Sequence, residues 1–183
     1  MVPTRAEAAD LAAVDKSATS LPTQKERLDQ LFTELKHARD PAAATEISQR
    51  IRIEWSDSGS ASINLLVQWA DKAIADNKRA AAMDLLDQVI YLSPHYVEGW
   101  NRRATLHFVM GSYRKSMSDI NRVLALEPRH FGAMAGMAAI LTSAGEDELA
   151  LRAWERFLEV YPADRQAQQQ VGELSEKLAG KRT

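Results

Sequence analysis

The sequence predicts an all-α protein in which antiparallel helix pairs stack side by side into a superhelix. Pro94, Pro128 and Pro162 follow one another at a constant spacing of 34 residues. Small and large apolar residues keep the same spacing, and the large ones recur with helical periodicity between the prolines. Such a repeat is typical of stacked helix pairs, because one pair cannot cover its own apolar face.

Residues 23–62 come first and are expected to form a helical hairpin. Thr23 and Glu26 have the spacing of a capping box, and Asp40 and Pro41 supply an N-cap and a first-turn proline for a second helix. This pair does not keep the 34-residue register, so it is either a degenerate repeat or an N-terminal cap. The apolar stripes of the two helices are Leu28, Leu31, Phe32 and Leu35, and then Ile47, Ile51 and Trp55.

Three repeat units follow, at residues 63–96, 97–130 and 131–164. Each unit has a turn position that calls for a left-handed backbone, which glycine adopts freely and asparagine tolerates. Small residues recur where the two helices must approach closely, and large apolar residues flank them. The turn positions are Asn77, Gly111 and Gly145; the small residues are Ala70, Ala104 and Ala138, with Ala82, Ser116 and Ala150; the large residues are Leu86, Ile120 and Trp154, with Val89, Val123 and Phe157.

The two ends of the chain are expected to differ from the repeats. Asp164 can cap a mostly polar helix within residues 165–183, whose apolar stripe covers the last face of the array as a C-terminal capping helix. Residues 1–22 are expected to form a mobile N-terminal arm, and whether the arm orders or docks in a groove stays open. The apolar stripe of the capping helix is Val171, Leu174 and Leu178.

Composition and motifs narrow the possible functions. The net charge of the 183 residues is −2, which gives no basic excess for nucleic acid, and no segment approaches the apolar length of a membrane span. There is no cysteine, which excludes disulfides and thiolate zinc sites. The chain has no catalytic motif, no phosphate-binding glycine loop and no metal-ligand spacing among its histidines. We therefore expect no catalytic residues, no metal and no cofactor.

The repeats resemble the tetratricopeptide repeat (TPR) family. The residues that best match its pattern are Trp100, Ala104, Gly111, Tyr113, Ile120, Val123 and Pro128. The resemblance implies that the first helix of each pair lines a concave face, and it places several side chains there that suit a peptide. The nominated partner-binding residues are Asn64, Gln68, Asp71, Asn101, Arg102, Thr105 and Phe108, with Val67 and Glu98 beside them and the small residues Ala135, Ala139 and Thr142 in the last repeat.

Neighbouring polar residues of the second repeat are expected to have different roles. Arg103 occupies a normally apolar position, and we expect its stem to pack while its guanidinium meets an acidic residue such as Asp119. Asn101 and Arg102 are expected to face solvent and to bind a partner's backbone amide and carboxylate. One TPR subtype grips a terminal carboxylate with a clamp of Lys, Asn and Arg. Gly132 and Gly136 stand where part of that clamp would be, which disfavours this activity.

These observations predict a non-catalytic protein–protein interaction module that binds a peptide or protein segment in the concave groove. The alternative is a structural or assembly subunit that self-associates through its terminal helices or convex face, and an enzyme is a distant third. The protein is expected to be a monomer or a weak homo-oligomer. The phrase EGWNRRATLHFVMGSY also resembles small, commonly exported TPR proteins of alphaproteobacteria, which suggests a periplasmic location, with the cytoplasm as the alternative.

Overall fold

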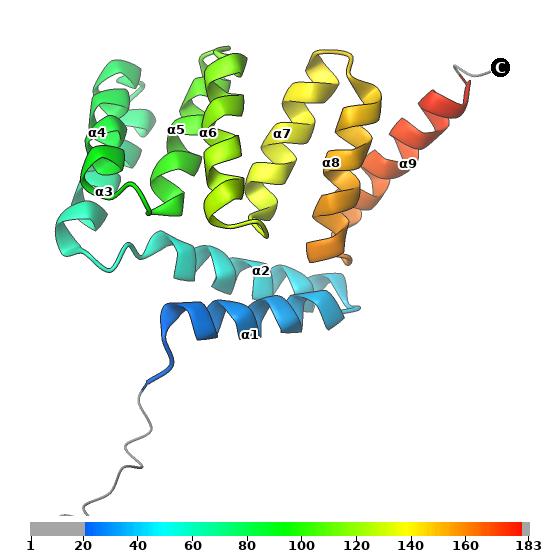
Figure 1. The fold of residues 1–183 in the computed structure, drawn as a ribbon, viewed down its shortest axis with the longest axis horizontal. Coiled ribbons are helices and arrows are strands. Elements are labelled where there is room, and N and C mark those ends of the chain that lie inside the picture. The colour runs from blue at the N-terminus through cyan, green and yellow to red at the C-terminus, as the bar shows by residue number, and fades with distance from the viewer. Residues whose placement is uncertain (1–20, 181–183) are drawn as a thin grey trace, which may run out of the picture.

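The computed structural model describes residues 21–180, which form helices joined by short turns and contain no strand (Figure 1). The all-α prediction is confirmed for this part of the chain, and nearly all of the expected N-terminal arm lies outside it. The helices are α1 Gln24–His37, α2 Pro41–Ser56, α3 Ala61–Ala75, α4 Arg79–Leu92, α5 Val97–Val109, α6 Tyr113–Leu126, α7 Phe131–Ser143, α8 Asp147–Val160 and α9 Arg165–Gly180.

Helices α3 to α8 form three antiparallel pairs that stand in a row, and α9 packs on α8 at the end of the row (Figure 1). The predicted turn residues allow the reversal within each pair. Asn77, Gly111 and Gly145 have φ values of 59°, 71° and 78°, the left-handed region in which a Cβ is strained. At the far end Asp164 accepts a hydrogen bond from the Ala167 N–H at 2.8 Å, which is the expected cap of α9.

The small residues that recur at 34-residue spacing lie where two helices approach closely. In the second pair Ala104 and Ser116 are both buried, and the Ser116 hydroxyl donates to the Ala104 carbonyl at 2.8 Å. A larger side chain at either position would push α5 and α6 apart. The other recurring small and large residues are buried as well: Ala70, Ala138, Ala82, Ala150, Leu86, Ile120, Trp154, Val89, Val123 and Phe157.

The α1–α2 hairpin does not extend the row. It runs crosswise beneath the lower ends of the other helices (Figure 1), and α1 contacts α8 while α2 contacts α5. Both predicted caps are present, since Thr23 and Glu26 form the capping box and Asp40 accepts from the Ala43 N–H at 3.0 Å. Arg129, between α6 and α7, joins the hairpin to the row through an ion pair of 2.7 Å with Asp29.

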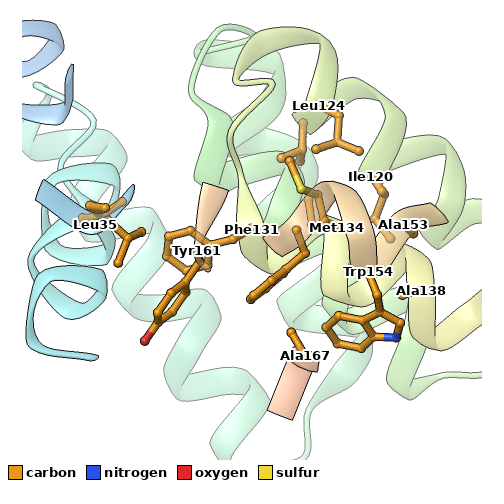
Figure 2. Packing of buried hydrophobic residues seen from close by; sticks show 14 of the residues in the cluster. Leu35, Ile120, Leu124, Phe131, Met134, Ala138, Ala153, Trp154, Tyr161 and Ala167 are labelled. Atoms are coloured by element: carbon orange, nitrogen blue, oxygen red, sulfur yellow. The ribbon is translucent and has the colours of Figure 1, made fainter. Parts of the chain in front are cut away.

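The main apolar core lies between the hairpin and the second and third helix pairs. Figure 2 shows Phe131 of α7 next to Tyr161, with Leu35 of α1 beyond it; the Phe131 and Tyr161 rings meet edge to face at 5.8 Å. The Trp55 ring of α2 also packs here, with its centroid 5.1 Å from that of Phe131. Burying one such side chain stabilises the fold by roughly 1.5–3 kcal/mol, so the hairpin is part of the core.

Because the hairpin lies crosswise, α3 is the first helix of the row and one of its faces is uncovered. Leu65 and Trp69, one turn apart on α3, are 43% and 52% exposed. In a solenoid this face is normally covered by a preceding repeat or a capping element.

Candidate functional site: a groove with one polar and one apolar hollow

A polar hollow of about 360 Å³ lies between α2, α3 and α5. Two of its residues come from the hairpin and the rest from the first helices of the first two pairs. Charged and amide side chains line most of it, so it suits a polar group of a ligand. Its lining residues are Arg52, Ser56, Asp71, Ile74, Glu98, Asn101, Arg102 and Thr105.

An apolar hollow of about 340 Å³ lies beside it, between α5 and α7. It exists because α7 presents glycine and alanine there, so no side chain fills the space. Asn101 and Thr105 border both hollows, and we call the two together the groove. The apolar hollow is lined by Ala104, Phe108, Ser116, Ile120, Gly132, Ala133, Ala135, Gly136, Ala139, Trp154 and Gln166, besides the two shared residues.

Side chains in the polar hollow are linked in a network across α3 and α5. Arg102 donates to Asp71 at 2.5 Å, and the Asn101 amide donates to Glu98 at 3.1 Å. The prediction that Arg102 faces solvent is wrong, because its side chain is only 26% exposed and its Nε is buried without an acceptor. Arg102 thus holds α3 to α5, which gives it a structural role in addition to any binding role.

Glu98 and His130 form a buried pair beneath this network. The His130 Nε2 lies 3.0 Å from the Glu98 Oε1, and the His130 Nδ1 accepts from the Ala133 N–H at 3.0 Å as the N-cap of α7. Since Nδ1 is an acceptor, the proton lies on Nε2 and is donated to Glu98. Burial raises the pKa of the Glu98 carboxyl, but bonds from His130 and Asn101 lower it more, and the pKa is below its ordinary value.

Arg52 is the cation that α2 brings to the groove. Its guanidinium lies 4.9 Å from the centre of the Phe131 ring, within cation–π range. One guanidinium nitrogen is 3.9 Å from the point that a Cβ on Gly132 would occupy, so Arg52 rests against the bare backbone of α7.

The nominated residues divide between the two hollows and positions outside them. Asp71, Asn101, Arg102 and Thr105 line the polar hollow, and Phe108 joins Asn101 and Thr105 in the apolar one. Of the small residues nominated in the last repeat, Ala135 and Ala139 line the apolar hollow and Thr142 does not.

Three nominated residues of α3 line neither hollow. Val67 is only 4% exposed and packs in a core cluster with Ile63 and Val89. Gln68 is exposed on α3. Asn64 is taken up by the loop before α3, since its amide donates to Asp57 at 3.0 Å and its oxygen accepts from the Ser58 N–H at 3.0 Å. The Asn64 side chain therefore holds the loop in place.

Sequence reasoning missed the groove residues that come from outside the repeats, namely Arg52 and Ser56 of α2 and Gln166 of α9. The stripe of Ile51 and Trp55 correctly marks the buried face of α2. Helical periodicity does not show, however, which helices that face packs against. The position of the neighbouring Arg52 in the groove therefore could not be predicted.

Arg103 lies outside the groove, as predicted. Its guanidinium donates to both oxygens of Asp119 at 2.8 and 2.7 Å and to Asp87 at 2.7 Å. These hydrogen bonds raise the pKa of Arg103 above its ordinary value. The expected partner Asp119 is confirmed, and the role of Arg103 is to join α5 to α4 and α6.

Within residues 21–180 no three His, Asp or Glu side chains come together as a metal-binding group. No helix in the same stretch combines the length and apolarity that crossing a bilayer requires.

Stacked helix pairs of constant length, with a groove lined by their first helices, define a helical-repeat protein. Comparison with known proteins makes the class specific. The chain is 61% identical over 181 residues to a TPR repeat-containing protein of Rhizobium etli, which covers 99% of this chain and 88% of that protein. The chain belongs to the TPR repeat-containing family, as its repeat pattern indicated, although no protein-family model matches it.

Solved structures agree on the fold. The Sgt2 TPR domain of Aspergillus fumigatus superposes with a TM-score of 0.60 at 16% identity, over 68% of this chain and 84% of that one. The first TPR domain of Spaghetti (RPAP3), bound to the HSP90 peptide SRMEEVD, superposes with a TM-score of 0.59 at 23% identity. The match covers 64% of this chain and 93% of that one.

A partial match to an enzyme also occurs. The 2,3-bisphosphoglycerate-dependent phosphoglycerate mutase of Mycobacterium tuberculosis is 30% identical over 111 residues, 55% of this chain and 42% of the enzyme.

Proposed function

We propose that this protein is a non-catalytic binding module that holds a segment of a partner protein in the groove. The observation that carries the proposal is the meeting of a polar and an apolar hollow at Asn101 and Thr105. A segment with an apolar side chain next to a polar one would fill both. Two solved TPR neighbours hold peptides, the HSP90 peptide in RPAP3 and an Hsp70 peptide in the TPR2B domain of yeast Sti1, which supports a peptide as the ligand class.

Each hollow offers a different contribution to binding. In the apolar hollow, a ligand side chain would leave water and contact Phe108 and Ala139; removing apolar surface from water contributes about 25 cal/mol per Å² before the cost of association. At the border, the Asn101 amide oxygen accepts no hydrogen bond from residues 21–180 and is free to accept one from a peptide N–H. The apolar hollow would provide affinity and Asn101 would fix the orientation.

The charged groups of the groove favour binding over catalysis. Arg102 is tied to Asp71, and Glu98 accepts from His130 and Asn101. The pKa of the Glu98 carboxyl is below its ordinary value, so the group loses its proton more readily than an ordinary glutamate. A general acid or base works best when its pKa is near the working pH, so Glu98 is poorly suited to that role near neutral pH. The periplasmic location suggested by the sequence remains a prediction.

The test is a selection of twelve-residue random peptides on the purified protein, followed by affinity measurements on Asn101→Ala/Thr105→Ala. We expect the selected peptides to bind this variant about tenfold more weakly, because it removes the polar groups shared by the hollows. The control is Asn121→Ala/Thr33→Ala, which makes the same changes at exposed positions of α6 and α1. A selection that yields no binder, or binders equally affected by both variants, would contradict the proposal.

One observation favours self-association as a second candidate function. The uncovered face of α3 presents Leu65 and Trp69, and such faces are common where two copies meet. If this face is an interface, the mass measured by light scattering at high concentration should be that of a dimer and should fall to that of a monomer in Trp69→Ser. A monomeric wild-type protein under the same conditions would rule this candidate out.

A further inference from the structure

We propose that the polar hollow binds the side-chain carboxylate of an Asp or Glu in the partner segment, and that Arg52 of α2 is the group that binds it. The inference rests on the proposed function and adds the chemistry of the ligand. It assigns a binding role to the hairpin, which lies outside the three repeats.

Arg52 is a cation with unused hydrogen-bonding capacity. Within residues 21–180 no carboxylate lies in ion-pair distance of its guanidinium and no acceptor takes its N–H groups; its contact is the face of the Phe131 ring. A guanidinium carries five N–H donors in a planar fork that matches a carboxylate. A ligand carboxylate would complete this fork without breaking a bond of the protein.

The other charges of the hollow leave room for a negative group. Arg102 lies between the two carboxylates, with Asp71 on one side and Glu98 on the other, and Glu98 also accepts from Asn101. Both acidic groups are therefore compensated locally. Among residues 21–180 the N–H groups of Arg52 have no acceptor, and neither does the buried Nε of Arg102. The hollow therefore has hydrogen-bond donors without acceptors, and a ligand carboxylate would supply acceptor oxygens for them.

Arg52 is held in position before any ligand arrives. It follows Ile51, which is fully buried, and precedes Trp55, whose ring stacks on His130 at 4.1 Å. Gly132 leaves the space in which the guanidinium rests against α7. A side chain whose backbone is fixed this way loses less freedom on binding, so its contact with a carboxylate contributes more to affinity.

The geometry favours an acidic residue inside a segment over a chain terminus. The polar hollow adjoins the apolar hollow at Asn101 and Thr105, and its lining residues Asp71 and Ile74, on α3, are 45% and 39% exposed. A bound segment can therefore continue in both directions. Its acidic side chain would meet Arg52 while a neighbouring apolar side chain fills the hollow beside Phe108.

The experiment uses peptides obtained from the twelve-residue random library with the full-length wild-type protein. Each is synthesised with an amidated and with a free C-terminus, and with its acidic residues changed singly to Gln or Asn. Dissociation constants are measured on wild type, Arg52→Gln and Arg50→Gln. Arg50→Gln is the matched control, because it removes the same charge from α2. Arg50 pairs with Glu34 and lines neither hollow of the groove.

We expect one acidic position in the peptide whose neutralisation weakens binding to wild type and to Arg50→Gln about tenfold or more, and has little effect on Arg52→Gln. An equal effect in Arg52→Gln and wild type, or peptides without an acidic residue, would overturn the inference and leave the proposed function intact. Loss of binding on amidation alone would overturn it in favour of a terminal carboxylate. A library that yields no peptide bound in the groove would overturn both proposals.

Discussion

The indole ring of Trp55 stacks on the imidazole of His130 with centroids 4.1 Å apart and ring planes inclined by only 15°. Trp55 lies in the last turn of α2 and His130 caps α7, so this contact joins the crosswise hairpin to the third repeat. The same imidazole donates to Glu98 of α5. One hydrogen-bonded and stacked chain of residues from three helices therefore connects Glu98, which lines the polar hollow, to the hairpin.

Truncating the buried indole should detach the hairpin from the row. Trp55→Ala is expected to lower the free energy of unfolding by about 3–5 kcal/mol, because it leaves a cavity beside Phe131 and His130. Chemical denaturation measures this loss. The matched control is Trp69→Ala on α3, where the half-exposed ring should cost far less. Equal losses for the two variants would show that the hairpin contributes little to the core.

Neutralising the buried carboxylate should change how stability depends on pH. The pKa of Glu98 in the folded protein lies below its ordinary value of 4.5, so its contribution to stability is full above that value and is lost as the pH falls through the folded pKa. At pH 7, Glu98→Gln should be less stable than wild type by about 1–3 kcal/mol. Denaturation from pH 7 to pH 3.5 should show this gap closing. A gap that is constant with pH would mean that the ionised carboxylate is not what stabilises the pair.

Two bidentate arginine pairs, Arg103 with Asp119 and Arg27 with Glu54, should contribute differently to stability because of burial. Arg103 and Arg27 each donate twice to a carboxylate, but Asp119 is only 5% exposed and Glu54 is 22% exposed. Arg103→Ala removes the hydrogen-bonded partner of the buried Asp119, leaving, within residues 21–180, only His107 beside it at 3.9 Å, and should cost about 3–5 kcal/mol. Arg27→Ala should cost much less, since the Arg27 side chain is 41% exposed and water screens its ion pair with Glu54. Thermal melts of both variants check this order, and a larger loss for Arg27→Ala would refute it.

Enlarging a recurring small residue should strain the close helix approach. Ala104→Leu is expected to destabilise by about 1–3 kcal/mol, because it overpacks the contact at which Ser116 donates to the Ala104 carbonyl. Ala81→Leu, the same change at an exposed position of α4, should be within about 0.5 kcal/mol of neutral. Urea denaturation compares the two, and a neutral Ala104→Leu would mean that α5 and α6 are not tightly packed there.

Much of the fold could be predicted because its signals are local. The capping box at Thr23, the N-cap at Asp40 and the positive φ at Gly111 each depend on residues a few positions apart. The constant repeat spacing then predicts that similar helix pairs stack on one another. The position of the hairpin has no such signal, since its contacts with the row join distant residues, as the ion pair of Asp29 with Arg129, 100 residues away, illustrates.

The groove could be predicted only as far as repeat positions determine it. Asn101, Thr105 and Phe108 lie where the family resemblance places them. Asn64 does not take part, because a loop specific to this chain uses its amide. Arg52 was out of reach, since it enters from a helix that keeps no repeat register. These outcomes depend on contacts between distant segments, which a periodic pattern does not contain.

We claim that a partner segment occupies the groove, and a side chain that fills the apolar hollow should then block binding. Ala139→Trp places a large ring in that hollow, whereas Ala81→Trp makes the same change at an exposed position of α4. Fluorescence anisotropy of a labelled library-selected peptide, with the fold of both variants checked by circular dichroism, should show at least about tenfold weaker binding to Ala139→Trp and unchanged binding to Ala81→Trp. Wild-type affinity in a folded Ala139→Trp would contradict the claim and move the binding site off the groove.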